Sequence, residues 1–209
     1  PTARDFWQLT AAANWHALAT FSGRLAEKGD ALLIDIGTTT TDFIPIQDGI
    51  PIPWGRTDRN RLASHELVYT GVGRTPVCSL ATQVTLDDHP IGLAAELFAT
   101  TRDVYLLTGD QQEDADCSDT ADGRPATRAN ASSRLARMLC CDTTEIRDDQ
   151  LLEIAQQIAS IQLERLLRAV TRVIGVSQDD PHPLETILIS GSGSFLARRL
   201  VAAHRDLAA

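Results

Sequence analysis

The 209-residue sequence has no long hydrophobic run, few cysteines and a shortage of positive charge, and each shortage excludes a class of protein. No apolar stretch approaches the roughly 20 residues that a membrane-spanning helix needs, so we expect no membrane partner. The 19 Lys and Arg against 28 Asp and Glu give a formal net charge of −9. This balance argues against nucleic acid as a partner. A small anionic ligand would need local amides, hydroxyls or a metal to hold it.

Cysteine and histidine are too sparse to suggest a disulfide framework or a zinc site. The four cysteines, Cys78, Cys117, Cys140 and Cys141, lack the spacing of either. We therefore expect reduced, buried thiols in a cytoplasmic protein. The five histidines are scattered without metal-ligand spacing, and the order of residues reveals no Ser-His-Asp or Cys-His arrangement.

The pattern of apolar residues predicts an α/β protein. Helical spacing predicts three main helices, at residues 4–28, 149–174 and 195–204. In the first of these, Phe21 and Leu25 belong to the apolar face that we expect to be packed. Strands are predicted around residues 31–47 and 185–190, separated by turn signals. Residues 91–109 are ambiguous, and we expect a helix from about Ala94 followed by a strand in "VYLLT".

The first informative turn is "IDIGTTTTDFIPI", where a strand runs into Asp35, Gly37, Thr38, Thr39, Thr40, Thr41 and Asp42. Gly37 lacks a Cβ, so the backbone can approach a ligand closely. The threonine hydroxyls and amides can line one concavity, and Asp35 and Asp42 suit a hydrated Mg²⁺. A strand follows, which excludes the P-loop and the Rossmann fingerprint, since both open a helix. The alternative is a simple threonine-rich β-hairpin.

The second informative turn is "ETILISGSGSF", a strand that passes through Ser190, Gly191, Ser192 and Gly193 into a helix. Glycines at such a junction let a ligand lie against the backbone at a helix N-terminus. Strand–glycine–helix junctions are common in α/β proteins, so this turn is informative mainly in combination with the first.

Together, and in this order, the two turns resemble the actin-like ATPase superfamily of sugar kinases, Hsp70 and actin, whose core is ribonuclease H-like. The resemblance implies a mixed sheet flanked by helices with an inserted β-rich or loop region. Asp35, Gly37 and Thr38 to Thr41 match the second phosphate loop, and Ser190 to Gly193 match the adenosine turn. The cofactors implied are Mg and ATP or another phosphorylated ligand. The expected segments are 1–56 and 126–209 for the ATPase-like core and 57–125 for the insertion.

Further stretches narrow the resemblance: "AANW", "ELVYTGVGRTPV", "ELFATTRDVYLLTG", "DTADGRP" and "SSRLARMLCCD". With the threonine turn they resemble a hydantoinase/oxoprolinase-related group linked to tetrahydromethanopterin-dependent one-carbon transfer. Its archaeal members join an aminomethylfuran phosphate unit to γ-glutamyltyramine in methanofuran biosynthesis. Nothing before Asp35 matches the superfamily's first phosphate loop. We therefore expect the chain to be the later part of a longer protein, without the N-terminal lobe.

Two loops add candidate charged groups. Arg74 in "YTGVGRTP" is suited to grip a phosphate or carboxylate with two hydrogen bonds, and Arg124 in "DTADGR" is suited to hold a diphosphate. Asp122 beside it is suited to a divalent ion or an amine. We therefore take Asp35, Asp42, Arg74, Asp122 and Arg124 as catalytic candidates. The alternative is that the three loop residues are ordinary solvated charges. Glu66 is a lesser candidate.

Three functions remain open from the sequence. The first is a Mg-dependent transferase that acts on a small-molecule substrate of methanofuran-type biosynthesis. The second is an ATP-dependent amidohydrolase like the hydantoinases and oxoprolinases, and the third is an actin-like nucleotide-binding regulatory protein. The sequence leaves open the exact substrate, the use of ATP and homo-oligomerisation.

Overall fold

The structure of the protein is a computed structural model that describes residues 14–176, 184–204 and 207. The chain divides into two compact units. The first, which we call the sheet unit, contains residues 1–69 and 165–209. The second, the insert unit, contains residues 70–164. This division differs from the expected segments 1–56, 57–125 and 126–209, because a late strand at 67–68 joins the sheet and the first half of a long helix packs inside the insert unit.

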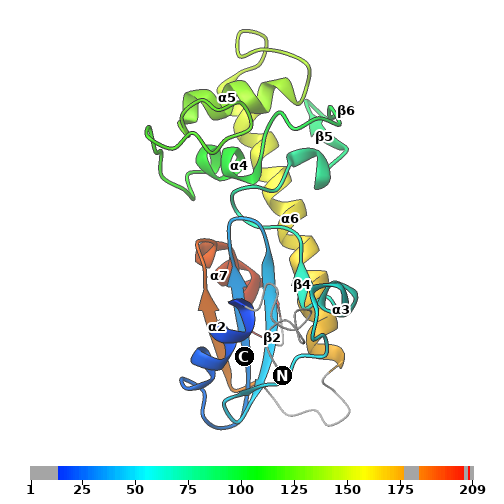
Figure 1. Cartoon of the computed structure of the whole chain (residues 1–209). Coiled ribbons are helices and arrows are strands. Elements are labelled where there is room, and N and C mark those ends of the chain that lie inside the picture. The colour runs from blue at the N-terminus through cyan, green and yellow to red at the C-terminus, as the bar shows by residue number, and fades with distance from the viewer. Residues whose placement is uncertain (1–13, 177–183, 205–206, 208–209) are drawn as a thin grey trace. The chain divides into compact units, whose positions relative to one another are not determined.

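The sheet unit contains a mixed sheet in the order β3-β2-β1-β7, with β4 also paired to β2 (Figure 1). The strands are β1 (Asp30–Ile36), β2 (Thr41–Gln47), β3 (Ile50–Pro51), β4 (Leu67–Val68) and β7 (Thr186–Ser190). β7 runs parallel to β1, and all other pairs are antiparallel. The α/β class, the mixed sheet and the strands around residues 31–47 and 185–190 are therefore confirmed.

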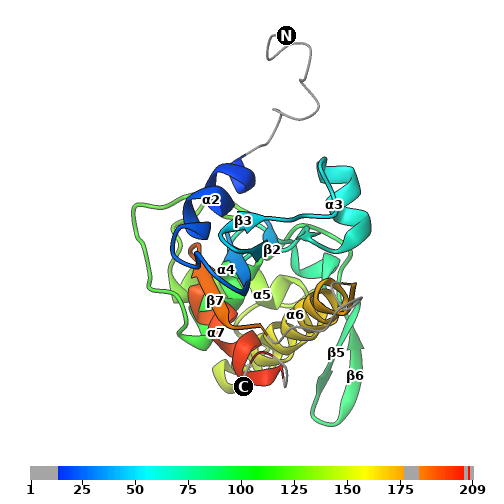
Figure 2. The ribbon, with the colours of Figure 1, turned by 90° about the horizontal axis from the view of Figure 1, so that it is seen from below.

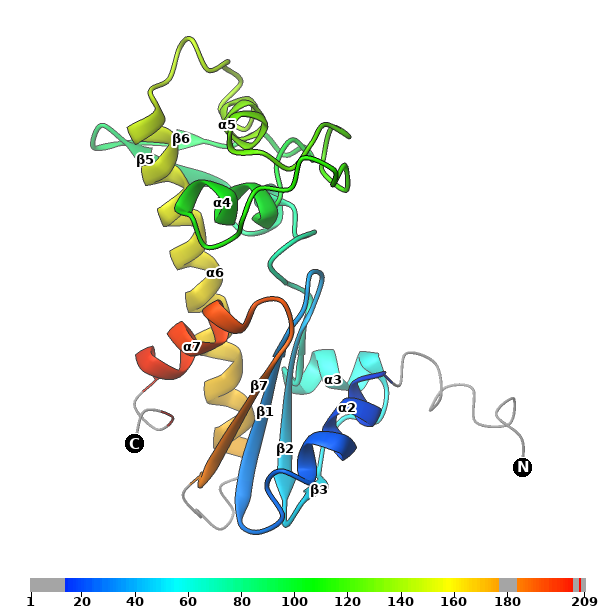
Figure 3. The same cartoon turned by 90° about the vertical axis from the view of Figure 1, so that its left-hand side faces the viewer.

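Helices cover both faces of this sheet. Alternate residues of β1 and β2, including Leu33 and Ile44, form a core with Ala19 of α2 (Asn14–Gly23). Figures 2 and 3 show α2 on one side of the sheet and α7 (Ser194–Ala203) on the other. This alternation follows from the two-residue period of a strand, which sends successive side chains to opposite faces. A short helix, α3 (Asp58–Ser64), precedes β4.

The first predicted helix differs from the observed one. Residues 4–13 lie outside the described residues, and α2 ends at Gly23 rather than at residue 28. A Cβ at Gly23 would lie 2.0 Å from the carbonyl oxygen of Gly49, so the close approach of another segment requires glycine there. Phe21 and Leu25 are 63% and 70% exposed, so their predicted packing is wrong for the described structure.

The insert unit is built from three helices and a hairpin. Its elements are the 3₁₀ turn η1 (Val77–Ser79), β5 (Gln83–Leu86), β6 (His89–Gly92), α4 (Thr101–Thr108), α5 (Arg128–Arg137) and the first part of α6 (Asp148–Val176). Its core includes Val104, Leu135, Ile154 and Ile158. The long helix α6 confirms the prediction for 149–174, and α7 confirms that for 195–204.

The "VYLLT" strand and the helix from Ala94 are wrong. These letters form α4, which starts after Thr100 and ends at Gly109 in the left-handed conformation. The Asp103 carboxylate accepts a hydrogen bond from the Thr100 N–H at 2.9 Å, the interaction of a capping box. The sequence contains the signals for both ends of this helix, Thr100 and Gly109, but the apolar run between them also has the pattern of a buried strand.

Two remaining expectations concern the state of the cysteines and the presence of membrane-spanning helices. All four cysteines are free, as expected, but none is fully buried: Cys140 is exposed and the other three are half-buried. Among the described residues, no helix has the length and apolar character needed to cross a membrane.

Candidate functional site

The β1–β2 hairpin closes through two residues only. Ile36 pairs with Thr41, and the Gly37 N–H donates to the Thr40 carbonyl at 2.9 Å, so Thr38 and Thr39 form the turn. Thr38 is exposed, and Thr39 and Thr40 are half-buried. Thr41 instead begins β2 and is fully buried. The turn therefore presents three of the four threonines to solvent.

Three polar residues stand in one row across the sheet beneath this turn. Asp35 is opposite Asp42 on β2 and in register with Ser190 on β7. Residues in register on neighbouring strands point to the same face, here the face that packs on α2. The apolar core of that face therefore ends in Asp42, Asp35 and Ser190 at the hairpin end of the sheet.

The bend after β7 lies directly beside the hairpin. The Gly193 N–H donates to the Ile36 carbonyl at 2.8 Å, and Gly193 is the N-cap of α7. Gly191 has φ +88°, and a Cβ there would lie 2.3 Å from the Ile36 carbonyl oxygen and 2.7 Å from a carboxylate oxygen of Asp35. Only glycine fits this position. The structure thus brings together the two turns that the sequence placed about 150 residues apart.

The two carboxylates of the row differ in their partners. Burial raises the pKa of Asp35, and the hydrogen bond from the Ser190 side chain acts against that rise. Burial also raises the pKa of Asp42, although the Arg61 guanidinium opposes it at 2.6 Å. The negative charge of Asp35 adds to the rise at Asp42. Asp42 is therefore paired with Arg61, while among the residues that the structure describes the side-chain partner of Asp35 is the hydroxyl of Ser190.

Arg61 is a site residue that the sequence analysis missed. It is 1% exposed on α3, and its guanidinium lies 3.9 Å from the centre of the Trp15 ring. Its partner Asp42 is 19 residues earlier in the chain, so no local signal marked the pair. Glu66, a lesser candidate, is also buried, and its carboxylate accepts the N–H groups of Trp54 and Gly55 at 2.7 and 2.8 Å. Glu66 therefore holds the loop before α3.

The donor set near Asp35 suits an ion that keeps most of its water. No group of three or more His, Cys, Asp or Glu side chains suited to a metal occurs within the described ranges. Mg²⁺ commonly takes only one or two protein carboxylates and completes its shell with water and substrate phosphates. Asp35, with Asp42 opposite it, provides the one or two carboxylates that such a hydrated Mg²⁺ needs. The two residues are too few for a metal ion that is held by protein ligands alone.

The insert unit brings together the two loops that contain the other candidates. Arg74 donates from Nε and Nη2 to Asp119 at 3.0 and 2.9 Å, and the two side chains are 61% and 56% exposed. Thr101 holds the arginine loop, since its hydroxyl donates to the Gly71 carbonyl at 2.8 Å. An exposed ion pair contributes little to stability. Arg74 can therefore exchange Asp119 for another anion at low cost.

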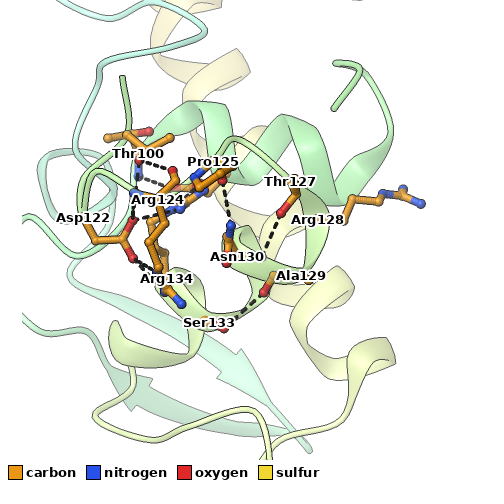
Figure 4. Close-up of polar contacts among 12 residues, drawn as sticks. Thr100, Asp122, Arg124, Pro125, Thr127, Arg128, Ala129, Asn130, Ser133 and Arg134 are labelled. Atoms are coloured by element: carbon orange, nitrogen blue, oxygen red, sulfur yellow. Dashed lines mark hydrogen bonds and ion pairs between the residues drawn. The ribbon is translucent and has the colours of Figure 1, made fainter. Parts of the chain in front are cut away.

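Asp122 bridges two arginines, as Figure 4 shows. It accepts from Arg124 at 2.7 Å and from Arg134 at 3.0 Å, and Arg134 also contacts Asp103 at 2.7 Å with both side chains fully buried. Burial acts to raise the pKa of Asp122, but the hydrogen bonds from Arg124 and Arg134 outweigh it and lower the pKa to about 2. Asp122 is thus ionised and orients Arg124, whose side chain is 43% exposed.

Asp103 and Arg134 were also missed by the sequence analysis. Burial raises the pKa of Asp103, and hydrogen bonds from Arg134 and Thr100 oppose the rise. Arg134 lies in "SSRLARM", a stretch that has the pattern of an ordinary core helix. The pair anchors the loop of Asp122 and Arg124 to α4 and α5.

Comparison with known proteins shows which family the chain resembles. Residues 1–205 match the family described as hydantoinase/oxoprolinase. The chain is 33% identical over 187 residues to the (4-{4-[2-(gamma-L-glutamylamino)ethyl]phenoxymethyl}furan-2-yl)methanamine synthase of Methanocaldococcus jannaschii. This aligned region is 90% of this chain and 54% of that protein. It is 34% identical to the synthase of the same name from Methanococcus vannielii over 169 residues. This aligned region is 81% of this chain and 73% of that protein. The chain thus spans about half the length of the first of these relatives.

Proposed function

The chain belongs to the hydantoinase/oxoprolinase family, and on that premise we propose that it is a Mg-dependent transferase of methanofuran-type biosynthesis. The reaction joins an aminomethylfuran phosphate or diphosphate to a γ-glutamyltyramine-like acceptor. Support comes from two relatives, both named synthases of a phenoxymethyl-furan methanamine. That name describes an ether between a phenol oxygen and a methylene carbon on the furan.

The chemistry of that ether defines what the site must do. The phenol oxygen attacks the furan methylene carbon, a new C–O bond forms, and the bond from that carbon to the phosphate oxygen breaks. The phosphate or diphosphate leaves with the electron pair, and the phenol proton passes to solvent or to a nearby base. Negative charge therefore builds up on the leaving group, and the protein must supply donors and positive charge there.

The observation that carries the proposal is the junction of the two turns. The hairpin of Thr38 and Thr39 and the bend at Gly191 lie at the same end of adjacent parallel strands, joined by the hydrogen bond from Gly193 to Ile36. Thr38 is exposed and Thr39 half-buried at this junction with the N-terminus of a ten-residue helix, a combination that favours phosphate. This arrangement is the one expected for a phosphate cradle of the actin-like ATPase type.

Gly37 supports the same interpretation. A Cβ there would lie 3.6 Å from its nearest neighbour, the Thr40 carbonyl oxygen, an ordinary contact distance. The fold therefore does not require glycine at this position, in contrast to Gly191. An approaching ligand would require it, because a side chain would occupy the space next to the backbone.

Asp35 is the residue that would hold Mg²⁺, with Asp42 in support through Arg61. A bound Mg²⁺ would neutralise charge on the leaving phosphate. In the insert unit, Arg74 and Arg124 are the proposed anion-binding groups, since both are partly exposed and each is oriented by a carboxylate. Ser190, Gly191 and Ser192 would contact the remainder of the phosphorylated ligand.

The test is a direct coupling assay. Purified protein is incubated with Mg²⁺, aminomethylfuran phosphate or diphosphate, and γ-glutamyltyramine, and the products are followed by mass spectrometry together with the release of phosphate or diphosphate. We expect the ether product from wild type and none from Asp35→Asn. Wild-type protein that binds the phosphorylated furan and Mg²⁺ but forms no ether would contradict the transferase proposal.

The family description itself favours a second candidate, an ATP-dependent hydantoinase or oxoprolinase activity. It differs in its products, because ring opening of a cyclic amide would consume ATP and release ADP. The same protein is therefore assayed with ATP and either hydantoin or 5-oxoproline. ADP release that depends on the cyclic amide would favour this activity over the transferase.

A further inference from the structure

The sheet unit contains a pocket built from residues that take no part in the two turns. A pocket of about 430 Å³ lies between the α3–β4 segment and the C-terminal part of α6. Its size falls in the range of small-molecule sites. One wall is formed by Leu62, His65 and β4, and the other by α6.

The α6 wall is strongly cationic. Arg165, Arg168 and Arg172 all line the pocket. Their spacings of three and four residues place them on one face of the helix, and they extend over about 10 Å along its axis. Like charges at such spacings repel one another. A ligand with opposite charge would remove that repulsion.

The pocket lining differs in charge from the protein as a whole. The lining contains no Asp or Glu, although the protein has a net charge of −9. Arg165 and Arg172 form no ion pair with any carboxylate among the residues that the structure describes. The Arg172 Nη1 lies 2.9 Å from the His65 Nε2. A guanidinium only donates, so Nε2 is the acceptor in this contact, and the contact brings no negative charge to the pocket.

The opposite wall is apolar and partly exposed. Leu67 and Val68 form its base, and Leu62 and Tyr69 are 45% and 63% exposed. A tyrosine ring and aliphatic side chains facing arginines suit a molecule with an apolar ring and an anionic group. Neither a bare ion nor an uncharged ring would use both walls.

We propose that this pocket is a binding site for a small organic anion that has two or more negative charges and a ring-containing apolar body. The arginines of α6 bind the anionic group, and Tyr69 with the leucines covers the ring. The site does not depend on the role of Asp35. It provides a second place in the sheet unit where a phosphorylated or polycarboxylate metabolite can bind.

The test uses three probes that separate the two walls. Phenyl phosphate has the ring and the charge, inorganic phosphate has the charge alone, and phenol has the ring alone. Binding to the full chain is measured by calorimetry in the presence of EDTA, so that a metal-dependent site does not contribute. We expect affinity to decrease from phenyl phosphate to inorganic phosphate, and no measurable binding of phenol.

The variants assign the binding to the pocket. The double variant Arg165→Gln with Arg172→Gln should weaken phenyl phosphate by at least about tenfold, since two charge-assisted contacts are lost. The matched control is Arg24→Gln with Arg198→Gln, which removes the same charge from exposed positions outside the pocket and should change affinity less than about twofold. Each single variant is also measured, so the test does not depend on the folding of the double variant.

A further variant tests the apolar wall of the pocket, and two outcomes would refute the proposal. Tyr69→Ala should reduce the advantage of phenyl phosphate over inorganic phosphate. If the Arg165 and Arg172 variants retain the wild-type affinity for phenyl phosphate, the anion binds elsewhere and the pocket proposal is wrong. Equal losses in the arginine variants and in their control would also overturn it, because general charge would then explain the effect.

Discussion

Asp35 on β1 and Ser190 on β7 occupy the same register position on adjacent parallel strands, and the Ser190 side chain is hydrogen-bonded to the Asp35 carboxylate. The last residues of two strands far apart in the sequence therefore form one polar contact. No cationic group pairs with Asp35 within the described part of the chain, so burial dominates and the pKa of Asp35 is raised. The protein retains an ionisable carboxylate at a position where it costs stability.

We expect Asp35→Asn to abolish Mg-dependent binding of diphosphate and, at the same time, to stabilise the fold at neutral pH. The raised pKa means that the protonated group favours the folded state, and this contribution is lost as pH rises through the folded-state pKa. The melting temperatures of wild type and variant should therefore converge as pH falls. Calorimetry with Mg²⁺ and inorganic diphosphate, together with thermal melts, checks both parts. Normal diphosphate binding by the variant would exclude Asp35 as the metal residue.

The pH dependence of Mg-dependent binding should shift in Ser190→Ala. The hydroxyl lowers the pKa of Asp35, so its removal should raise that pKa further and move the loss of binding to higher pH. Diphosphate affinity is measured from pH 4 to 8 with Mg²⁺ present, a range set by the ordinary titration of carboxylates. Thr20→Ala, which removes an exposed hydroxyl on α2, is the control and should leave the profile unchanged. Identical profiles for Ser190→Ala and wild type would contradict the role of this contact.

Two glycines of the site should respond in opposite ways to a methyl group. Gly191→Ala should lose about 1–3 kcal/mol of unfolding free energy, because its φ is +88° and the Cβ meets the Ile36 carbonyl. Gly37→Ala should leave stability unchanged or raise it by up to about 1 kcal/mol, yet weaken diphosphate binding. Urea denaturation and calorimetry separate the two effects. Full diphosphate affinity in Gly37→Ala would show that no ligand approaches the backbone there.

Arg61→Met should be among the more damaging substitutions, at about 3–5 kcal/mol, because it leaves the Asp42 carboxylate buried without its partner. Asp42 already has a raised pKa, so the loss should be smaller at low pH, where the carboxyl is neutral in both states. Adding Asp42→Asn should recover a large part of the stability. A double-mutant cycle in urea measures this coupling, and additive losses would show that the two groups act independently.

Asp122→Asn should destabilise the protein at neutral pH by about 1 kcal/mol, a figure reduced for solvent screening. The pKa of Asp122 is lowered to about 2, so its contribution is present above the ordinary value of 3.8 and is lost as pH falls toward 2. The difference between wild type and variant should therefore shrink over that window in denaturation curves. Asp119→Asn, which breaks only an exposed pair, should change stability by less than about 0.5 kcal/mol. A constant difference down to pH 2 would contradict the assignment.

Local patterns were sufficient for the elements with strong periodicity. The helix at 148–176, the helix after "GSGS" and the strands on either side of the threonines follow from apolar spacing and glycine positions. Periodicity was insufficient for α4, where the four-residue run "VYLL" is compatible with a strand or a buried helix, and the capping signals at Thr100 and Gly109 decided the outcome. Periodicity also misjudged the first helix, because Phe21 on α2 and Leu25 beyond its end are exposed.

The sequence by itself determined the two turns, because glycine, threonine and aspartate at strand ends act through the local backbone. Only the tertiary structure decided which charges meet: Asp42 with Arg61, Asp122 with Arg134, and three arginines of α6 with the α3–β4 segment. These partners are 12 or more residues apart, and their contacts depend on how helices and strands pack. A one-dimensional pattern records which residues are charged, whereas burial and distance, which set their pKa values and their partners, exist only in the folded chain.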